Sequence, residues 1–278
     1  AVAFCSYNMQ IIQVGHNTKM MAIAWLPWVL AAVIFTYRTA LSMFRVNADE
    51  SPKSTSWKSW LPQTILGASL FGMALNFQIK ANHIQISYYL AIIIFCYAIG
   101  LFIWLVADKE RRHGIAKFFA ASALLLTIGI IGIGANANKL IPTYNYSKHT
   151  MRGGSELAVE SSENSGKTKG LDLEYATAWS YGWQELPNMM IPDFNGGASS
   201  GAVNYSRSET IKLLKQYGQP NLREVAKSLP LYWGPQPFTA GPMYMGAITI
   251  FLFILGLFMC KGRDKWWILA ATVIAILL

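Results

Sequence analysis

The stretch of sequence that decides the fold is SYYLAIIIFCYAIGLFIWLVA, residues 87–107, which contains no Lys, Arg, Asp or Glu. As an α-helix rising about 1.5 Å per residue it would be roughly 31 Å long, the hydrocarbon thickness of a bilayer. Tyr88, Tyr89 and Trp104 stand near its ends, where amphipathic rings favour the headgroup region. The stretch therefore predicts a membrane-spanning helix.

The composition favours the same class of protein. Of the 278 residues, 53% are apolar and 13% are charged, whereas a soluble domain usually carries about 25% charged residues. The net charge of +9 would suggest nucleic-acid binding in a soluble protein. Here the cations separate by loop, so they are interpreted as a topology signal and no nucleic-acid partner is expected. The three cysteines lie in apolar runs and predict neither a disulfide framework nor a zinc site.

Further apolar stretches predict an all-α polytopic membrane protein, a multi-span helical bundle with one long loop. Residues 1–135 and 242–278 are expected to form membrane helices. Residues 136–241 are polar and rich in Gly, Ser, Asn and Pro, which predicts a partly helical extracytoplasmic loop. The chain is expected to be an internal piece of a longer protein. The expected spans are about 1–5 (partial), 20–37, 62–79, 87–107, 118–135, 243–260 and 266–278 (truncated).

The loops between these spans differ in charge. The loops 38–60, 108–117 and 261–265 hold eleven Lys or Arg residues, whereas the short links 6–19 and 80–85 hold only Lys19 and Lys80. Cytoplasmic loops of membrane proteins carry an excess of Lys and Arg. The pattern therefore predicts a multi-pass protein of the cytoplasmic (inner) membrane, with residues 136–241 outside.

Local patterns add detail to two regions. Gly67, Ala68 and Gly72 give the third span a small face for close helix packing. Within the long loop, residues 208–217 predict a short helix ended by Gly218. Residues 221–229 predict another, with Asn221 and Glu224 spaced as a capping box.

Polar residues that could carry chemistry gather on the predicted outer face. The cations there could bind a lipid phosphate, and loop carboxylates could act as a general base or metal ligand. Each has a structural alternative that the sequence leaves open: an interfacial histidine, a solvated cation or a turn carboxylate. There is no phosphate-loop signature, HExxH, GxSxG or paired CxxC. The candidates are His16, Asn17, Lys19, Asn82, His83 and Arg152 for binding, and Asp172 and Asp193 for catalysis.

Four motifs carry a resemblance to a known family. They are SYNMQIIQVGHNTKMMAIAWLPWVL (6–30), ALNFQIKANHIQISYYL (74–90), YSKHTMRGGSEL (146–157) and YWGPQPFTAGPMYMGAI (232–248). In this order they resemble the YfhO family of bacterial membrane proteins, which is similar to the glycosyltransferases of the C-type membrane fold (GT-C).

The resemblance implies a GT-C-like fold and a specific activity. The protein would move a sugar from a polyprenyl-phosphate donor to an envelope polymer or glycan acceptor, with membrane lipid around it. The sequence leaves open whether a divalent metal is a cofactor. The usual catalytic carboxylate of that fold lies in the first outer loop, which would precede residue 1. By the same resemblance His16, Asn17, Lys19, Asn82 and His83 would line the donor-phosphate pocket, with Arg152 in its roof.

Two other functions remain open. A transporter or flippase for a lipid-linked precursor would need polar residues along a path through the spans, and the spans contain few. A non-catalytic envelope scaffold would use residues 136–241 as a binding module.

Overall fold

The computed structural model describes residues 5–43, 56–147, 149–150 and 177–278, and all structural statements below concern these residues. The chain divides into two compact units. The bundle unit comprises residues 17–146 and 254–278, and the loop unit comprises residues 1–16 and 147–253. Helices dominate the described residues, which contain isolated β-bridges but no β-strand.

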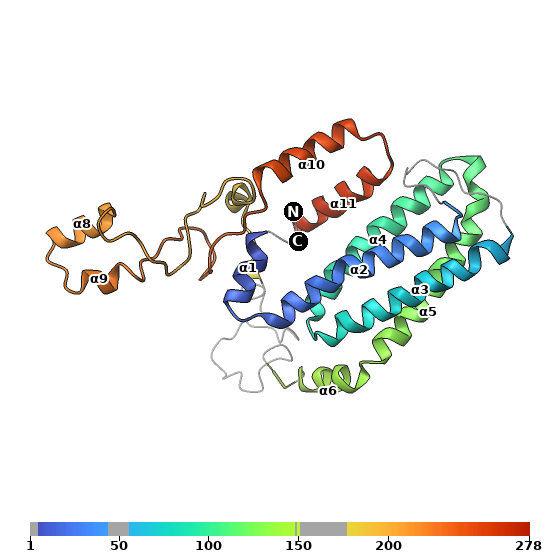
Figure 1. Ribbon diagram of the computed structural model, residues 1–278, viewed down its shortest axis with the longest axis horizontal. Helices are drawn as coiled ribbons and strands as arrows, with labels where there is room; N and C mark the ends of the chain where they lie inside the picture. Colours follow the sequence, from blue (N-terminus) through green and yellow to red (C-terminus); the bar gives the residue numbers. More distant parts are fainter. Residues whose placement is uncertain (1–4, 44–55, 148, 151–176) are drawn as a thin grey trace, which may run out of the picture. The chain divides into compact units, whose positions relative to one another are not determined.

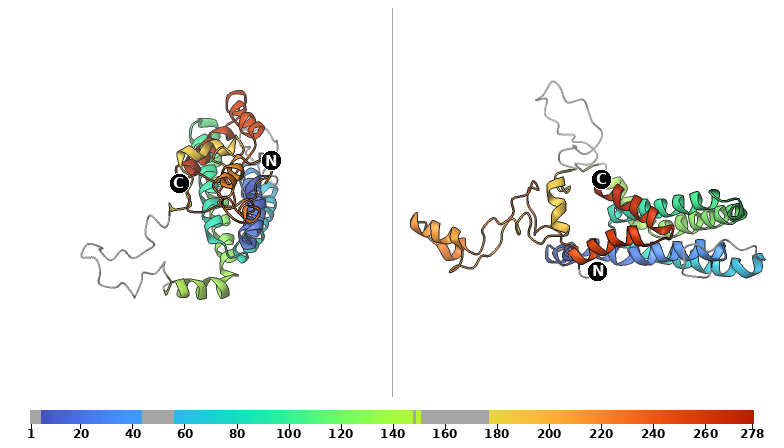
Figure 2. Two further views of the ribbon diagram at one scale, coloured as in Figure 1. Left: turned by 90° about the vertical axis from the view of Figure 1, so that its left-hand side faces the viewer. Right: turned by 90° about the horizontal axis from the view of Figure 1, so that it is seen from above.

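Four long helices form the bundle unit and lie side by side (Figure 1). In the right-hand view of Figure 2, α2 and α3 form one layer and α4 and α5 another. The 3-10 helix η2 (Lys109–Gly114) connects α4 to α5, α6 (Ala137–Ser147) follows α5, and α11 (Asp264–Leu277) packs on α4. The four long helices are α2 (Asn17–Ala40), α3 (Trp57–Lys80), α4 (Ile84–Val106) and α5 (Ile115–Gly134).

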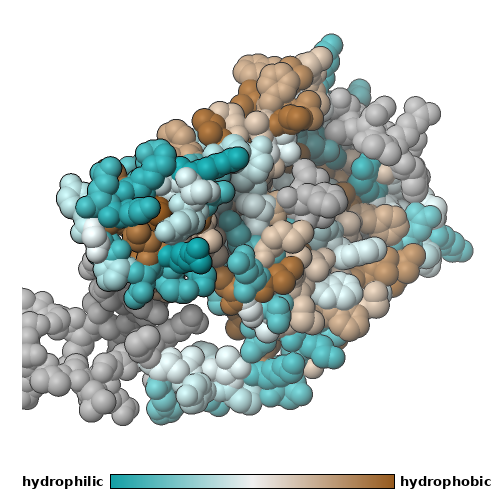
Figure 3. Space-filling model, turned by 60° about the vertical axis from the view of Figure 1, so that its left-hand side comes forward, coloured by the Kyte–Doolittle hydropathy of each residue, from teal (hydrophilic) through white to brown (hydrophobic). Residues whose placement is uncertain are grey.

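Three helical segments of the described chain are long and apolar enough to cross a membrane. They are Asn17–Ala40, Ile84–Val106 and Lys109–Gly134, with mean hydropathies of 1.9, 2.5 and 2.0. Large apolar side chains point outward from them: Leu126 and Ile130 on α5 are 68% and 70% exposed. Figure 3 shows such hydrophobic side chains on the surface of the molecule. An apolar surface of this kind requires a covering, and a lipid bilayer supplies one, so the unit is compatible with a multi-pass membrane protein.

Helix α3 is as long as α2 but is not among these three segments. Its small residues allow the close packing that the sequence predicts. A Cβ atom on Gly67 would lie 2.6 Å from Thr36 Oγ1 and 3.1 Å from Thr36 Cα on α2. On the α5 side, a Cβ atom on Gly132 would lie 3.0 Å from the carbonyl oxygen of Gly72. The glycines therefore bring α3 close to both neighbours.

The two C-terminal helices are shorter than the long four. Helix α10 (Ala247–Met259) has 13 residues, about 20 Å at 1.5 Å per residue. It begins later than the expected span at 243–260 because the preceding residues are extended. The N–H groups of Met245 and Gly246 donate to the carbonyl of Met189, and Gly246 has a φ of 109°.

Irregular pairing between residues 195–201 and 229–233 organises the loop unit. Gly196 pairs with Tyr232 and Gly201 pairs with Leu229, both antiparallel. Gly196 has a φ of +79°, and a Cβ atom there would lie 1.9 Å from the carbonyl oxygen of Leu231. Only glycine fits this approach. The unit also contains α1 (Ser6–Gln13), the 3-10 helix η3 (Trp183–Met189), α8 (Glu209–Gln216) and α9 (Leu222–Val225).

The short helices of this unit correct two predictions and confirm one. Residues 6–19 were expected to be a polar link, but residues 6–13 form α1 and Asn17 already begins α2. Helix α8 is confirmed: Ser208 Oγ accepts from Ile211 N–H, and Gly218 ends it with a φ of +71°. The capping box at Asn221 is wrong, because Asn221 adopts a left-handed conformation and its side chain makes no cap hydrogen bond.

Candidate functional site

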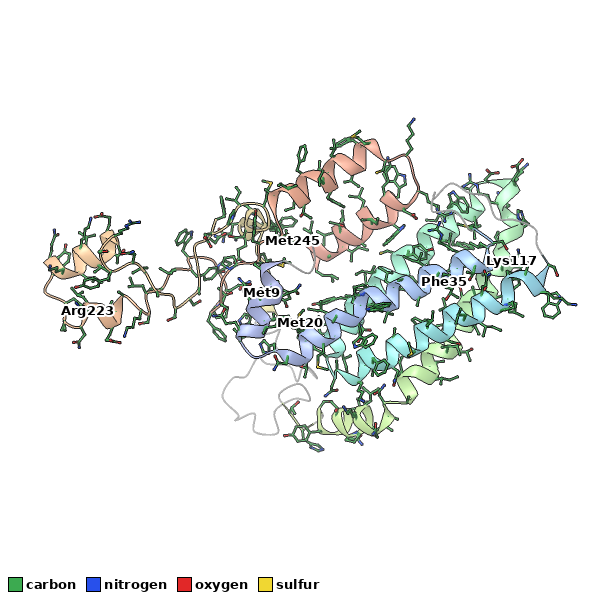
Figure 4. All side chains as sticks on the ribbon, viewed as in Figure 1. Met9, Met20, Phe35, Lys117, Arg223 and Met245 are labelled. Atoms are coloured by element: carbon green, nitrogen blue, oxygen red, sulfur yellow. The ribbon has the colours of Figure 1, made fainter. Side chains whose placement is uncertain are left out.

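The structure places four of the predicted binding residues at one end of the bundle unit. This amide end is formed by the start of α2, the end of α3, the start of α4 and the start of α6. Ala22, Ala81 and Ile86 form a buried cluster that joins α2, the α3–α4 turn and α4. Met20, labelled in Figure 4, marks this end of α2, and Phe35 and Lys117 lie toward the opposite end. The four predicted residues at the amide end are Asn17, Lys19, Asn82 and His83.

The turn between α3 and α4 positions Asn82 and His83. Asn82 has a φ of 57°, and its N–H donates to the carbonyl of Ile79 at 2.8 Å. Asparagine tolerates this left-handed conformation better than most residues and often ends helices. His83 directly precedes α4, and its carbonyl accepts from Ile86 N–H at 3.1 Å. The backbone therefore holds both side chains at the amide end.

The left-handed turn gives a first prediction. Asn82→Ala should destabilise the bundle unit by about 1 kcal/mol because alanine is strained at positive φ. Asn82→Gly should leave its stability almost unchanged while also removing the amide. Thermal unfolding of both variants in detergent checks this, and equal loss in the two would show that the amide, not the backbone conformation, stabilises the turn.

Buried amides link the helices beneath this turn. Asn136 Nδ2 donates to Asn76 Oδ1 at 2.8 Å, to the Asn76 carbonyl at 3.2 Å and to the Gly132 carbonyl at 3.3 Å. Gln78 is 0% exposed, and its Nε2 donates to the Ala22 carbonyl at 3.5 Å. Its Oε1 is buried without a hydrogen-bond partner among the described residues. Asn136 was not a predicted site residue, although the polar run Asn136–Lys139 after the glycine-rich helix signals it.

The charge at the amide end is entirely positive within the described residues. Lys19, Lys80 and Lys139 lie here, and Lys139 Nζ donates to the Lys80 carbonyl at 3.4 Å. The carboxylates of the described bundle unit, Asp108, Glu110 and Asp264, all lie at the opposite end. Cations and amide donors without acidic competitors suit an anion such as a phosphate. The described residues of this end supply no carboxylate base.

The remaining predicted residues belong to the loop unit or lie outside the described residues, although His16 directly precedes Asn17 in the chain. His16 belongs to the loop unit, where Gly15 N–H donates to the Ile12 carbonyl and His16 N–H to the Ile11 carbonyl. These bonds form a Schellman motif, the usual way of ending a helix. Arg152 and Asp172 lie outside the described residues.

Asp193, the other predicted carboxylate, belongs to a turn of the loop unit. It is exposed with a φ of 55°, and its carbonyl accepts from Gly196 N–H at 2.8 Å. The described residues contain no group of three or more His, Cys, Asp or Glu side chains placed to hold a metal ion. The geometry around Asp193 thus supports its alternative interpretation as a turn residue.

A buried carboxylate in the loop unit was missed by the sequence analysis. Glu185 is 1% exposed, and its Oε2 accepts from Gly182 N–H at 3.0 Å. Its Oε1 accepts from the Tyr232 hydroxyl, which in turn accepts from Gln236 N–H at 3.1 Å. The sequence signal is a glutamate three residues after the start of a turn, which also occurs at many exposed positions. These bonds tie η3 to the aromatic segment after residue 231.

The Tyr232 hydroxyl gives a prediction on pH. Burial, with the hydrogen bond to Glu185 as a second cause, raises the pKa of Tyr232 from 10.0 to about 12. Unfolded tyrosine ionises near its ordinary pKa, so the folded state binds more protons between these values. The stability of the loop unit should therefore be complete below pH 10 and fall as the pH rises to about 12. Alkaline unfolding of wild type and Tyr232→Phe checks this, because the variant should lose that part of the pH dependence.

Comparisons with known proteins give no relative for the chain. No family model, no curated protein and no solved structure matches it.

Proposed function

We propose that the chain is part of a multi-pass membrane protein whose amide end binds the phosphate of a polyprenyl-phosphate sugar, and that the protein transfers this sugar to an envelope acceptor. The observation that carries the proposal is the chemistry of the amide end: three lysines, several amides and no carboxylate among its described residues. Departure of a lipid phosphate from a sugar requires positive charge and hydrogen-bond donors at that phosphate. Transfer of the sugar itself is taken from the resemblance to the YfhO family.

The distribution of charge supports an outer location for the amide end. The described bundle unit has three cations at this end and nine at the other. Under the positive-inside rule the end with nine cations faces the cytoplasm. A polyprenyl-phosphate sugar in the outer leaflet would then reach Lys19 and the Asn82–His83 turn at headgroup depth.

The roles of the residues at the amide end differ. Lys19 contributes a point charge to the phosphate, and Asn17 and Asn82 contribute amide N–H donors. His83 supplies a ring that can donate to a phosphate oxygen. The hydrogen bond between Asn76 and the buried Asn136 holds α3 against the end of α5 and so fixes the position of the turn. A general base for the acceptor hydroxyl must come from outside the described residues of this end.

The test uses the full-length gene product with two readouts, retention of polyprenyl phosphate by the purified protein and sugar transfer in membranes. Lys19→Ala and His83→Ala should each reduce both by about tenfold, the loss expected for one charge-assisted hydrogen bond. Lys58→Ala is the matched control, because it removes a lysine from the opposite end of the same unit.

Three results would contradict the proposal in different ways. Normal retention of polyprenyl phosphate in both variants would remove the amide end as its binding site. Retention without any transfer by the wild-type protein, together with movement of the lipid-linked sugar across vesicles, would favour the transporter. A wild-type protein that neither retains polyprenyl phosphate nor transfers the sugar would favour the non-catalytic envelope scaffold.

A further inference from the structure

The end of the bundle unit opposite the amide end contains a tryptophan with two guanidinium groups against its ring. The Arg263 Cζ atom lies 3.8 Å from the Trp104 ring centroid, and the Arg111 Cζ atom lies 4.5 Å from it. Trp104 is near the end of α4, Arg111 is in η2 and Arg263 directly precedes α11. We call Trp104, Arg111 and Arg263 the arginine–tryptophan cluster. Two segments distant in sequence, residues 104–111 and the residue before α11, thus build one cationic site.

Hydrogen bonds hold the cluster in a defined geometry. Arg111 Nη1 donates to the Trp104 carbonyl at 3.2 Å, and its Nε and Nη2 donate to Asp108 Oδ2 at 3.1 and 3.0 Å. The N–H of Glu110 and the guanidinium of Arg111 lower the pKa of Asp108, which keeps this carboxylate ionised. The Arg263 side chain is only 12% exposed, and its Nε lies 3.8 Å from Asp264 Oδ1. Both arginines are therefore pre-positioned rather than mobile surface charges.

Cationic side chains at this end far outnumber the carboxylates. The described residues place nine Lys and Arg side chains here but only Asp108, Glu110 and Asp264 as carboxylates. A further cation at the same end also lies near an aromatic ring: the Lys117 ammonium is 5.7 Å from the Trp60 ring centroid. The nine cations are Arg38, Lys58, Lys109, Arg111, Arg112, Lys117, Lys261, Arg263 and Lys265.

Apolar side chains next to the cluster indicate what kind of anion fits. Ile103, adjacent to Trp104, is 61% exposed. Phe119 is 57% exposed, and its ring lies 5.8 Å from that of Phe102 on the same helix as Trp104. Tryptophan and arginine at the end of a membrane helix, followed by outward apolar residues, match the headgroup and tail regions of a lipid.

We propose that the arginine–tryptophan cluster binds the phosphate of an anionic glycerophospholipid, with the acyl chains lying along the Ile103 and Phe119 surface. Guanidinium groups bind phosphate oxygens through paired N–H donors, which favours arginine here over lysine. This inference rests on the membrane location in the proposed function. It is independent of sugar transfer and of the amide end.

The test uses the full chain purified in detergent with equal amounts of phosphatidylglycerol and phosphatidylcholine, and counts retained lipids by native mass spectrometry. Wild type should retain phosphatidylglycerol preferentially. Arg263→Gln should lower this preference about fivefold, the effect of one cation at a membrane surface. Arg263→Lys should keep most of the charge effect and lose the stacking. Arg223→Gln is the control, because Arg223 lies 6.0 Å from the Tyr205 ring in the loop unit (Figure 4).

Three outcomes would overturn the inference. They are an unchanged preference in Arg263→Gln, an equal loss in Arg223→Gln, and release of the retained lipid by equimolar inorganic phosphate, which would indicate a free-anion site. Flotation of the chain with vesicles separates this inference from the proposed function. If the chain floats with the vesicles but does not prefer phosphatidylglycerol, only the lipid-site inference is wrong. If the chain does not float, the membrane location is wrong, and both this inference and the proposed function fail.

Discussion

Gly67→Val should separate α2 from α3 and destabilise the bundle unit by about 3 kcal/mol, the upper range for overpacking a close-packed interface. A Cβ atom on Gly67 meets Thr36 Oγ1 at 2.6 Å, the Phe35 ring at 2.8 Å and Thr36 Cα at 3.1 Å. Thr36 is fully buried, and its hydroxyl already donates to the Ala32 carbonyl at 2.7 Å. Its backbone cannot move without displacing the whole helix.

The measurement is thermal unfolding of the purified chain in detergent, followed by the helical circular dichroism signal. Gly134→Val is the matched control, since a Cβ atom on Gly134 meets nothing within 4 Å. It introduces the same branched side chain on a helix without a clash. Equal unfolding temperatures for the two variants would show that α2 and α3 do not pack at the distance described.

Glu185→Ala should release the aromatic segment of the loop unit at a cost of about 3 kcal/mol. The substitution removes a buried acceptor of two hydrogen bonds, from Gly182 N–H and from the Tyr232 hydroxyl. Each bond to a charged acceptor contributes about 1.5–3 kcal/mol, and the donors remain buried without it. Hydrogen–deuterium exchange should therefore accelerate in residues 181–201 and 229–244 but not in the bundle unit.

Glu224→Ala in the same unit gives the matched control for this prediction. Glu224 also accepts from a side chain, the Lys227 ammonium at 2.8 Å, but its side chain is 72% exposed. An exposed ion pair contributes at most about 1 kcal/mol. Similar exchange rates in the two variants would mean that Glu185 does not hold the segment in solution.

The long helices could be predicted because charge-free stretches of bilayer length have few alternatives to a helix. Each of the four long helices, however, begins three to five residues before the predicted span, at Asn17, Trp57, Ile84 and Ile115. A first turn can be polar because its N–H groups and side chains face water or headgroups. Hydropathy therefore cannot distinguish it from a loop, and Asn17 and Lys19 were assigned to the link rather than to α2.

Helix α1 was not predicted because its hydropathy pattern, like that of a polar first turn, resembles a loop. It is short, and its buried residues Asn8 and Ile11 are three apart, so only one turn of it carries a recognisable pattern. The grouping of Asn17 and Lys19 with Asn82 and His83 was predictable, because alternating antiparallel helices return to the same end. The partners of the amides were not, since they depend on how α3 rotates against α2 and α5. Glu185 could not be found, because burial of a loop carboxylate requires the fold around it.

The unequal charge at the two ends of the bundle unit makes it an electric dipole along its helices. If the bundle unit spans a membrane whose interior is electrically negative, in the orientation proposed above, the transmembrane voltage would help to hold the arginine-rich end inside. Moving one elementary charge across such a membrane involves about 2.3 kcal/mol per 100 mV. Collapse of the voltage would therefore remove an orienting force that no packing contact within the protein supplies.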